Sequence, residues 1–300
     1  MSADPVVATA GLTKRYGSSR GIEDVNLEVV PGEVFGFLGP NGAGKTTTIR
    51  TLLDLIHPTA GSARLFGLDS RRDSVAIRAR LGNLPGDFGY GRGASGREAL
   101  RLLSQLRGIS GFGRAEELAA RFHADLDRPL GKLSRGNRQK IGLILACFHQ
   151  PDLLILDEPT SGLDPLMQEE FLALIGEERE RGAAVFLSSH ELDEVERICD
   201  RVGMVRGGRL IAVERVQVLL KKASRKVNVR LADGGGLDEL RGVPGVSVLD
   251  VSDGRVSFRY AGDLDPVVKA LARHHVLDLE ATHPDLEEVF LGYYEGKGES

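Results

Sequence analysis

Residues 34–46 read Val-Phe-Gly-Phe-Leu-Gly-Pro-Asn-Gly-Ala-Gly-Lys-Thr, and they carry the strongest indication of the fold class. Its first five residues are a continuous apolar run, which is typical of a strand covered on both faces. Residues 39–46 then match the pattern GxxxxGK[ST], and apolar residues recur at helical spacing from Ile49 to Ile56. A strand, a glycine-rich loop and a helix in this order predict an α/β protein with a phosphate-binding loop.

The chemistry of this loop follows from its residue types. Glycines let backbone N–H groups converge on phosphate oxygens, and the N-terminus of the following helix adds partial positive charge. Lys45 supplies a point charge for the phosphates, and Thr46 offers a hydroxyl to Mg²⁺. We therefore expect the loop and the first helical turn to bind a nucleotide. The residues concerned are Gly39, Pro40, Asn41, Gly42, Ala43, Gly44, Lys45, Thr46 and Thr47.

A second apolar run, residues 153–156, ends in two adjacent carboxylates, Asp157 and Glu158. Ligands of open α/β sheets bind at the C-terminal ends of the strands, so both side chains are expected near the phosphates. Asp157 is placed to hold Mg²⁺, and Glu158 to accept a proton from an attacking water.

Further motifs resemble those of the ABC ATPases, in the order that this family has them. Residues 133–140, Leu-Ser-Arg-Gly-Asn-Arg-Gln-Lys, resemble the family signature, which usually begins Leu-Ser-Gly-Gly-Gln. Residues 161–164 resemble the D-loop, and His190, at the end of the apolar run 184–187, resembles the switch histidine. Tyr16 resembles the aromatic residue that stacks on adenine.

The resemblance implies a mechanism and a fold. Two ATPase domains would meet head to tail around two ATP molecules with Mg²⁺. Ser134 and Gly136 of one subunit would cap the γ-phosphate that Lys45 of the other subunit holds. His190 would sense that phosphate and fix the general base and the water, and Asp164 would link the two sites. The expected domain has a RecA-like core and a helical subdomain.

Two positions depart from the family pattern. Gly86 stands where the family's Q-loop normally has a glutamine, so no side chain is available there to reach Mg²⁺. Asp87, one residue later, or a water is a possible substitute. In the signature, Arg135 and Asn137 replace Gly and Gln, and the added cation is expected to contact the γ-phosphate or the partner subunit.

The pattern divides the chain into two domains. Residues 1–223 alternate short apolar strands with helical stretches, which predicts a mostly parallel α/β domain. Residues 90–147 carry leucines at helical spacing and predict a helical subdomain, preceded by a glycine-rich loop at 85–96. Residues 202–205 and 210–213 flank Gly207-Gly208 and predict a hairpin.

The remaining segment, residues 224–300, predicts a small α+β domain. Apolar and polar residues alternate at 227–231 and again at 256–260, which indicates half-buried strands. A helix is expected to start at Asp265-Pro266. A last helix is expected from the apolar residues Leu286, Val289, Phe290 and Tyr293.

Composition narrows the class of protein. The 300 residues are 41% hydrophobic and 27% charged, as in ordinary globular domains, and the net charge of −4 provides no general basic field for nucleic acid. Two cysteines, Cys147 and Cys199, cannot build a disulfide framework, so a reducing compartment and structural roles are expected. The apolar run 141–148 is far short of the ~20 residues that cross a bilayer. With no signal peptide recognised either, we expect a cytoplasmic chain whose membrane role comes through a partner.

The C-terminal segment 282–290, Thr-His-Pro-Asp-Leu-Glu-Glu-Val-Phe, resembles the ending of bacterial daunorubicin/doxorubicin-type drug-resistance ATPases. Such ATPases serve exporters whose permease is a separate membrane protein. One phosphate loop and one signature make this chain half of an ATPase pair. We therefore expect a homodimeric exporter ATPase, peripheral on the cytoplasmic face of the membrane, that contacts its permease through the 85–96 loop.

Two alternatives stay open at this stage. One is a soluble ABC ATPase without a permease, such as a regulatory or ribosome-associated factor, although tandem ATPase cassettes would favour it and are absent here. The other is an import ATPase, although importers usually keep the Q-loop glutamine and carry a different C-terminal domain. The transported compound is not encoded in this chain, because export specificity lies mostly in the permease.

Overall fold

The computed structural model describes residues 4–17, 19–88, 93–232, 237–252, 255–282, 289–290 and 292–293. The chain divides into two units, residues 1–213 and 214–300. The sequence pattern put this division after residue 223, where strand alternation begins, whereas the structure assigns the short helix α8 (Val216–Lys222) to the second unit. No Pro- or Gly-rich linker flanks this helix, so composition did not mark the boundary.

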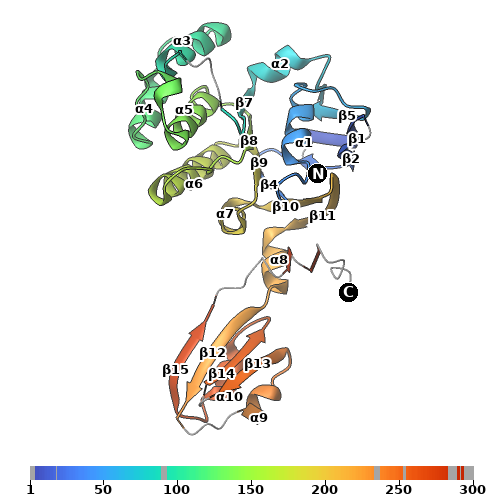
Figure 1. The fold of residues 1–300 in the computed structure, drawn as a ribbon, viewed down its shortest axis with the longest axis vertical. Helices are drawn as coiled ribbons and strands as arrows, with labels where there is room; N and C mark the ends of the chain where they lie inside the picture. Colours follow the sequence, from blue (N-terminus) through green and yellow to red (C-terminus); the bar gives the residue numbers. More distant parts are fainter. Residues whose placement is uncertain are drawn as a thin grey trace. The chain divides into compact units, whose positions relative to one another are not determined.

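A six-stranded sheet lies at the centre of the first unit. In spatial order its strands are β11 (Arg209–Arg215), β10 (Arg201–Arg206), β4 (Val34–Leu38), β9 (Ala184–Ser189), β8 (Leu153–Asp157) and β7 (Leu81–Leu84) (Figure 1). The last five of these pair in parallel. Every residue of β4, β8 and β9 is buried, which explains their unbroken apolar sequences. The predicted strands and the hairpin at Gly207-Gly208 are confirmed.

A second, antiparallel sheet was not predicted from the sequence. It contains β2 (Ser19–Val25), β1 (Val7–Tyr16), β5 (Ala60–Leu65) and β6 (Leu68–Asp69), and β3 (Glu28–Val29) also pairs with β1. Helix α1 (Lys45–Leu52) contacts strands of both sheets, and their buried residues form one core. Register shifts in β1, after Ala10 and after Leu12, break the polar–apolar alternation that would have revealed it.

The predicted helical subdomain is present within residues 90–147. Its helices are α3 (Gly96–Arg107), α4 (Gly113–Arg121) and α5 (Arg135–Cys147), and both α3 and α4 pack on α5 (Figure 1). Helix α3 begins at a capping box between Ser95 and Glu98 and ends at the left-handed Gly108. Residues 89–92 of the preceding loop lie outside the described residues.

Further helices, of which that at Pro165–Glu180 is the longest, complete the first unit. They are α2 (Ser74–Ala79), the 3₁₀ helix Leu130–Lys132, α6 (Pro165–Glu180) and α7 (Leu192–Ile198). Cys147 and Cys199 are both buried, and burial raises the pKa of each thiol well above its usual range, which agrees with structural roles. Within the described part of the chain, no helix has the length and apolar character needed to cross a bilayer.

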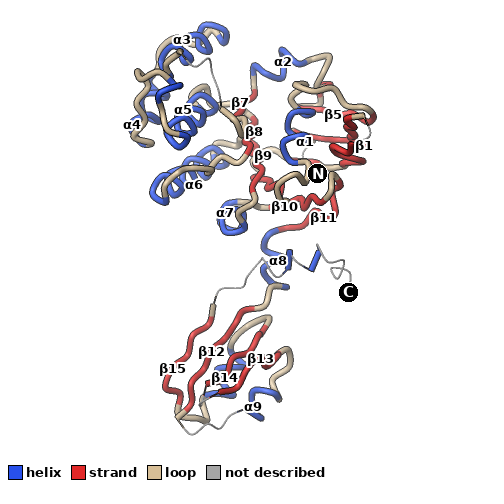
Figure 2. The backbone as a smooth tube through the Cα atoms, viewed as in Figure 1, coloured by secondary structure: helices blue, strands red, loops and turns tan. Residues whose placement is uncertain are grey.

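The second unit is the expected α+β domain. Strands β13 (Val246–Ser252), β14 (Arg255–Tyr260), β12 (Arg225–Leu231) and β15 (Val276–Ala281) form an antiparallel sheet in that order (Figure 2). Apolar residues of the sheet share one core with α9 (Leu237–Arg241) and α10 (Asp265–Leu271). Of the expected last helix, residues 289–290 and 292–293 are helical, whereas Leu286 and most of the 282–290 motif lie outside the described residues.

Candidate functional site

The phosphate loop, residues 39–46, joins β4 to α1, as the sequence predicts. Gly44 caps α1 with φ 113°, a left-handed conformation that side chains disfavour. A Cβ there would also lie 2.9 Å from Cγ2 of Ile22, so the loop packs tightly against β2. The Gly208 amide donates to the Ala43 carbonyl at 2.8 Å, which holds the loop from the hairpin side.

The first turn of α1 presents free donors beside a buried cation. The amides of Lys45, Thr46 and Thr47 have no acceptor within the helix, because they belong to its first turn. The Lys45 side chain is only 5% exposed, and its Nζ donates to the Gly39 carbonyl at 2.7 Å. Thr46 is exposed at the surface, and Thr47 is half-buried. This arrangement suits an anion of high charge.

The three residues predicted to be catalytic converge on one point. Glu158 follows β8 directly, and its Oε1 lies 3.5 Å from Nζ of Lys45. The same oxygen lies 3.4 Å from Nδ1 of His190, which follows β9. Because β8 and β9 are parallel neighbours, their C-terminal ends bring the carboxylate and the imidazole together beside the phosphate loop.

The hydroxyl of Ser188, which sequence reasoning left without a role, contacts both acidic residues: the side chain of Asp157 and the backbone of Glu158. Ser188 lies in β9, and its Oγ donates to Oδ1 of Asp157, whose side chain is buried. The amide of Glu158 donates to both the Oγ and the carbonyl of Ser188, each at 3.1 Å. Ser188 directly follows the apolar run 184–187, so its place at the end of a predicted strand was the available signal.

A buried carboxyl that the sequence did not reveal contacts the residue before His190. Glu194 in α7 is 7% exposed, and its Oε2 accepts a hydrogen bond from Oγ of Ser189 at 2.6 Å. Burial raises the pKa of this carboxyl to about 7. The segment that carries His190 is therefore tied to α7 through Ser189.

The signature and the D-loop lie against each other. Ser134 caps α5 by accepting the Asn137 amide, and Asp164 caps α6 by accepting the Met167 amide. A Cβ on Gly136 would lie 2.2 Å from the Gly162 carbonyl, so only glycine fits there. The structure thus places Ser134, Gly136 and Asp164 in one region.

The structure shows which groups surround the two positions that differ from the family pattern. Arg135 donates to Oγ of Ser161 in the same chain at 2.8 Å. At the Q-loop position, a Cβ on Gly86 would lie 3.1 Å from Oδ2 of Asp157. Asp87 is exposed and borders a cavity of about 200 Å³, together with Gly86 and the residues Phe88, Arg135, Arg138 and Gln139.

Tyr16 lies close to the phosphate loop. It ends β1, and its ring is 48% exposed, with Nζ of Lys14 5.3 Å from the ring centroid. A Cβ on Gly21 would lie 3.0 Å from the Tyr16 ring, and the Gly21 carbonyl lies 3.3 Å from the Cβ position of Gly44. Gly21 thus lies between the Tyr16 ring and the phosphate loop. The exposed face of the ring is suited to stacking on a base.

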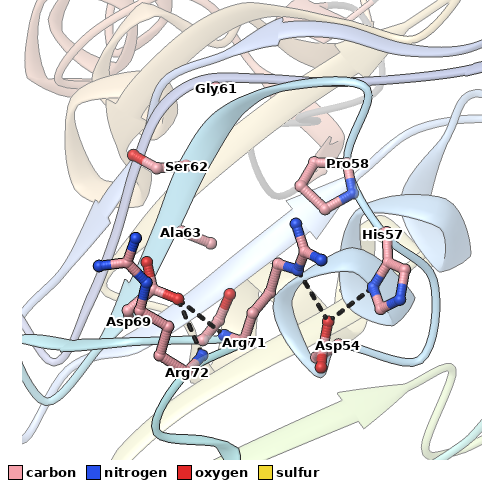
Figure 3. Close-up of a pocket in the computed structure, with 10 residues that line it drawn as sticks. Asp54, His57, Pro58, Gly61, Ser62, Ala63, Asp69, Arg71 and Arg72 are labelled. Carbon is pink, nitrogen blue, oxygen red and sulfur yellow. Dashed lines mark hydrogen bonds and ion pairs between the residues drawn. The ribbon is translucent and has the colours of Figure 1, made fainter.

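A larger cavity of about 460 Å³ is separate from this chemistry (Figure 3). It includes Asp54, just beyond the C-terminal end of α1, whereas the phosphate loop lies at the N-terminal end. Its charged groups are largely engaged with one another: Asp54 lies 3.0 Å from Nδ1 of His57 and 3.8 Å from Nε of Arg71. Asp69 accepts the amides of Arg71 and Arg72, which lowers the pKa of its carboxyl. We assign this cavity no role in nucleotide binding.

Comparison with known proteins agrees with the geometry. Residues 22–161 match the family model described as ABC transporter. The chain is 37% identical to the bacitracin transport ATP-binding protein BcrA of Bacillus licheniformis, over 76% of each chain. It is 34% identical to the daunorubicin resistance ATP-binding protein DrrA3 of Streptomyces coeruleorubidus, over 96% of each chain.

A solved structure described as the ATP-binding subunit of an ABC transporter superimposes with a TM-score of 0.67 at 29% identity. The match covers 72% of this chain and 92% of that one. The RecA-like core with its phosphate loop, the helical subdomain with its signature and the cluster around Glu158 all lie in the first unit. The chain therefore belongs to the ABC transporter family of ATP-binding proteins, and its reaction is the hydrolysis of ATP.

Proposed function

We propose that this chain is the ATPase subunit of a bacterial exporter for drugs or other hydrophobic compounds, working as a homodimer on a separate permease. The observation that carries the proposal is the meeting of Lys45, Glu158 and His190 at the carboxyl ends of two parallel strands. The relatives named for bacitracin transport and daunorubicin resistance support the export role, and the second of them matches both units of the chain.

The geometry supports a separate role in hydrolysis for each of these side chains. Lys45 and the first-turn amides of α1 would bind the terminal phosphate oxygens of ATP. Glu158 would accept the proton of the attacking water, and the imidazole of His190 would orient that water from the other side of the carboxylate. Ser188 would hold the backbone of Glu158 and the side chain of Asp157 in fixed positions.

The residues beside the loop fit Mg²⁺. The Thr46 hydroxyl and the Asp157 carboxylate are hard oxygen ligands, and Mg²⁺ is usually held by one or two protein groups together with substrate phosphates. No group of three or more potential metal-binding side chains occurs in the described part of the chain, so a metal held entirely by protein is not supported. When bound, Mg²⁺ neutralises phosphate charge.

The signature region supports dimerisation. Ser134 is exposed at the N-terminus of α5, where free amides favour an anion. Leu166, two residues after Asp164, is 77% exposed, which suits a surface that a second copy covers. We infer that Ser134 and Gly136 of one subunit close over the ATP held by its partner, and that hydrolysis loosens this closure.

The permease contact is proposed at the helical subdomain. Leu102 and Leu106, which are 47% and 74% exposed, belong to α3, the helix that follows the 85–96 loop in sequence. Such apolar side chains suit a docking surface for a membrane partner, which would hold the chain at the cytoplasmic face. Co-purification in mild detergent, followed by mass spectrometry, is expected to recover a stoichiometric membrane protein; recovery of the chain alone or with ribosomes would contradict the exporter.

Glu158→Gln tests the chemistry. The amide keeps the shape but does not accept the proton, so we expect ATP binding to persist and turnover to fall about 10²–10⁴-fold. A dimer is expected to accumulate with ATP in gel filtration. Glu180→Gln, at the exposed end of α6, serves as the matched control and should leave turnover unchanged. Near-normal turnover in Glu158→Gln would remove Glu158 from the role of general base.

A further inference from the structure

A buried amide of the helical subdomain holds the backbone beside the general base. Gln139 lies in α5 and is 4% exposed. Its Nε2 donates to the carbonyls of Glu158 and Pro159, both at 3.0 Å. Because both acceptors are carbonyl oxygens, one amide nitrogen engages two consecutive peptide groups with its two protons.

The backbone that Gln139 holds has an unfavourable conformation. Glu158 has φ 50°, in the left-handed region that residues with a Cβ seldom adopt. Such a conformation persists only where its surroundings determine it. The turn is held from one side by Ser188, which accepts the Glu158 amide, and from within by the Ser161 amide, which donates to the Glu158 carbonyl at 3.2 Å. The two hydrogen bonds from Gln139 are a third set of contacts that hold this turn.

We propose that Gln139 is a positioning residue for ATP hydrolysis, which fixes the left-handed turn at Glu158 so that its carboxylate points between Lys45 and His190. The inference rests on the proposed role of Glu158 as general base. The contact connects the signature helix to the base, because Gln139 lies about one helical turn after Gly136. A displacement of α5 at its nucleotide-facing end therefore reaches the backbone of Glu158 through two hydrogen bonds.

The test is a kinetic comparison of variants of the full chain. Gln139→Leu removes both donors at similar volume, and Gln139→Glu keeps the shape but presents acceptor oxygens to the two carbonyls. Both are expected to lower kcat about 10–100-fold, as for a reacting group displaced by about 1 Å, and to leave KM for ATP within about 3-fold. Gln105→Leu, on the exposed face of α3, is the matched control and should not change kcat.

A double variant separates positioning from general damage to the fold. In the Glu158→Gln background, Gln139→Leu should cause no further loss of turnover, because the group that it positions is already inactive. A further loss of 10-fold or more would indicate a structural effect and overturn the proposal. So would kcat within 2-fold of the parent in both Gln139 variants while Glu158→Gln is slow. Normal turnover in Glu158→Gln alone is a distinct result, which would overturn the proposed function and this inference with it.

Discussion

Replacing Ser188 with alanine is expected to destabilise the first unit, because two buried polar groups depend on its hydroxyl. The Oγ donates to Oδ1 of Asp157, and it accepts the amide of Glu158 at 3.1 Å. Ser188 is 0% exposed and Asp157 is 2% exposed, so water does not replace the lost hydroxyl. The Glu158 amide keeps the Ser188 carbonyl as an acceptor, whereas the carboxylate loses this donor outright.

The magnitude follows from the charge on the acceptor. A hydrogen bond to an ionised group contributes about 1.5–3 kcal/mol to the free energy of unfolding. For a unit of some 200 residues, 1 kcal/mol corresponds to about 2–4 °C in Tm, so Ser188→Ala should lower Tm by about 3–12 °C. The assay is thermal unfolding at neutral pH, followed together with ATP turnover, which should also fall as Asp157 loses its orientation.

Ser104 offers a matched control. It is 4% exposed in α3, and its Oγ has no hydrogen-bond partner among the described residues. Removing a buried hydroxyl that makes no hydrogen bond relieves a desolvation cost, so Ser104→Ala should leave Tm unchanged or raise it. Equal losses of Tm for the two serines, or no loss for Ser188→Ala, would refute the reasoning that the Asp157 hydrogen bond stabilises the site.

Two further predictions rest on buried groups near the site. Burial raises the pKa of Glu194 to about 7, above its unfolded value, so the stability it contributes is complete at low pH and is lost as pH rises toward 7, by up to about 3 kcal/mol. Raising the pH from 5 to 8 should therefore lower the Tm of the parent relative to the Tm of Glu194→Gln. A Tm difference that stays constant with pH would contradict a neutral buried carboxyl. Gly136→Ala puts a Cβ 2.2 Å from the Gly162 carbonyl and should cost about 1–3 kcal/mol in thermal unfolding. Gly176→Ala, in open space on α6, should instead stabilise by a few tenths to about 1 kcal/mol, and the same sign at both glycines would count against the clash.

The parallel core was predictable because its strands are buried on both faces. The runs at 34–38 and 153–156 leave no other assignment when a glycine-rich loop or two carboxylates follow. The antiparallel sheet was not predictable, because bulges in β1 interrupt its alternation. In the second unit, β15 was missed for a related reason: five of its six residues are exposed, so burial imposes no pattern on its sequence.

Site residues were predictable where one segment carries both the motif and its chemistry. The loop around Lys45 and the carboxylates at the end of β8 are of this kind, and the structure brings Lys45 and Glu158 together. Gln139 and Ser188 are distant in sequence from Asp157 and Glu158. They act by hydrogen bonding to the backbone and side chains at the end of β8. Gln139 lies inside the quoted signature and Ser188 directly after the apolar run 184–187, but their roles depend on tertiary contacts that spacing does not specify.

Arg135 stands where this chain departs from the family signature. As an added cation beside the signature, it was expected to contact the γ-phosphate or the partner subunit. In the structure its guanidinium donates to Ser161 of its own D-loop at 2.8 Å, beside the close approach of Gly136 to Gly162. A side chain that replaces the family's glycine thus joins the signature to the D-loop within one chain.

The missing side chain at Gly86, the Q-loop position, affects the surroundings of Asp157. The two oxygens of Asp157 have different surroundings: Oδ1 accepts the Ser188 hydroxyl, while Oδ2 faces the bare Cα of Gly86. A Cβ at position 86 would stand 3.1 Å from Oδ2, close enough that the carboxylate would have to move by a few tenths of an ångström. Because Ser188 restrains that movement through the other oxygen, a longer side chain at position 86 would press on the carboxylate that we propose as a Mg²⁺ ligand. Glycine leaves its second oxygen unobstructed, so the orientation of Asp157 is set from β9 rather than from the Q-loop.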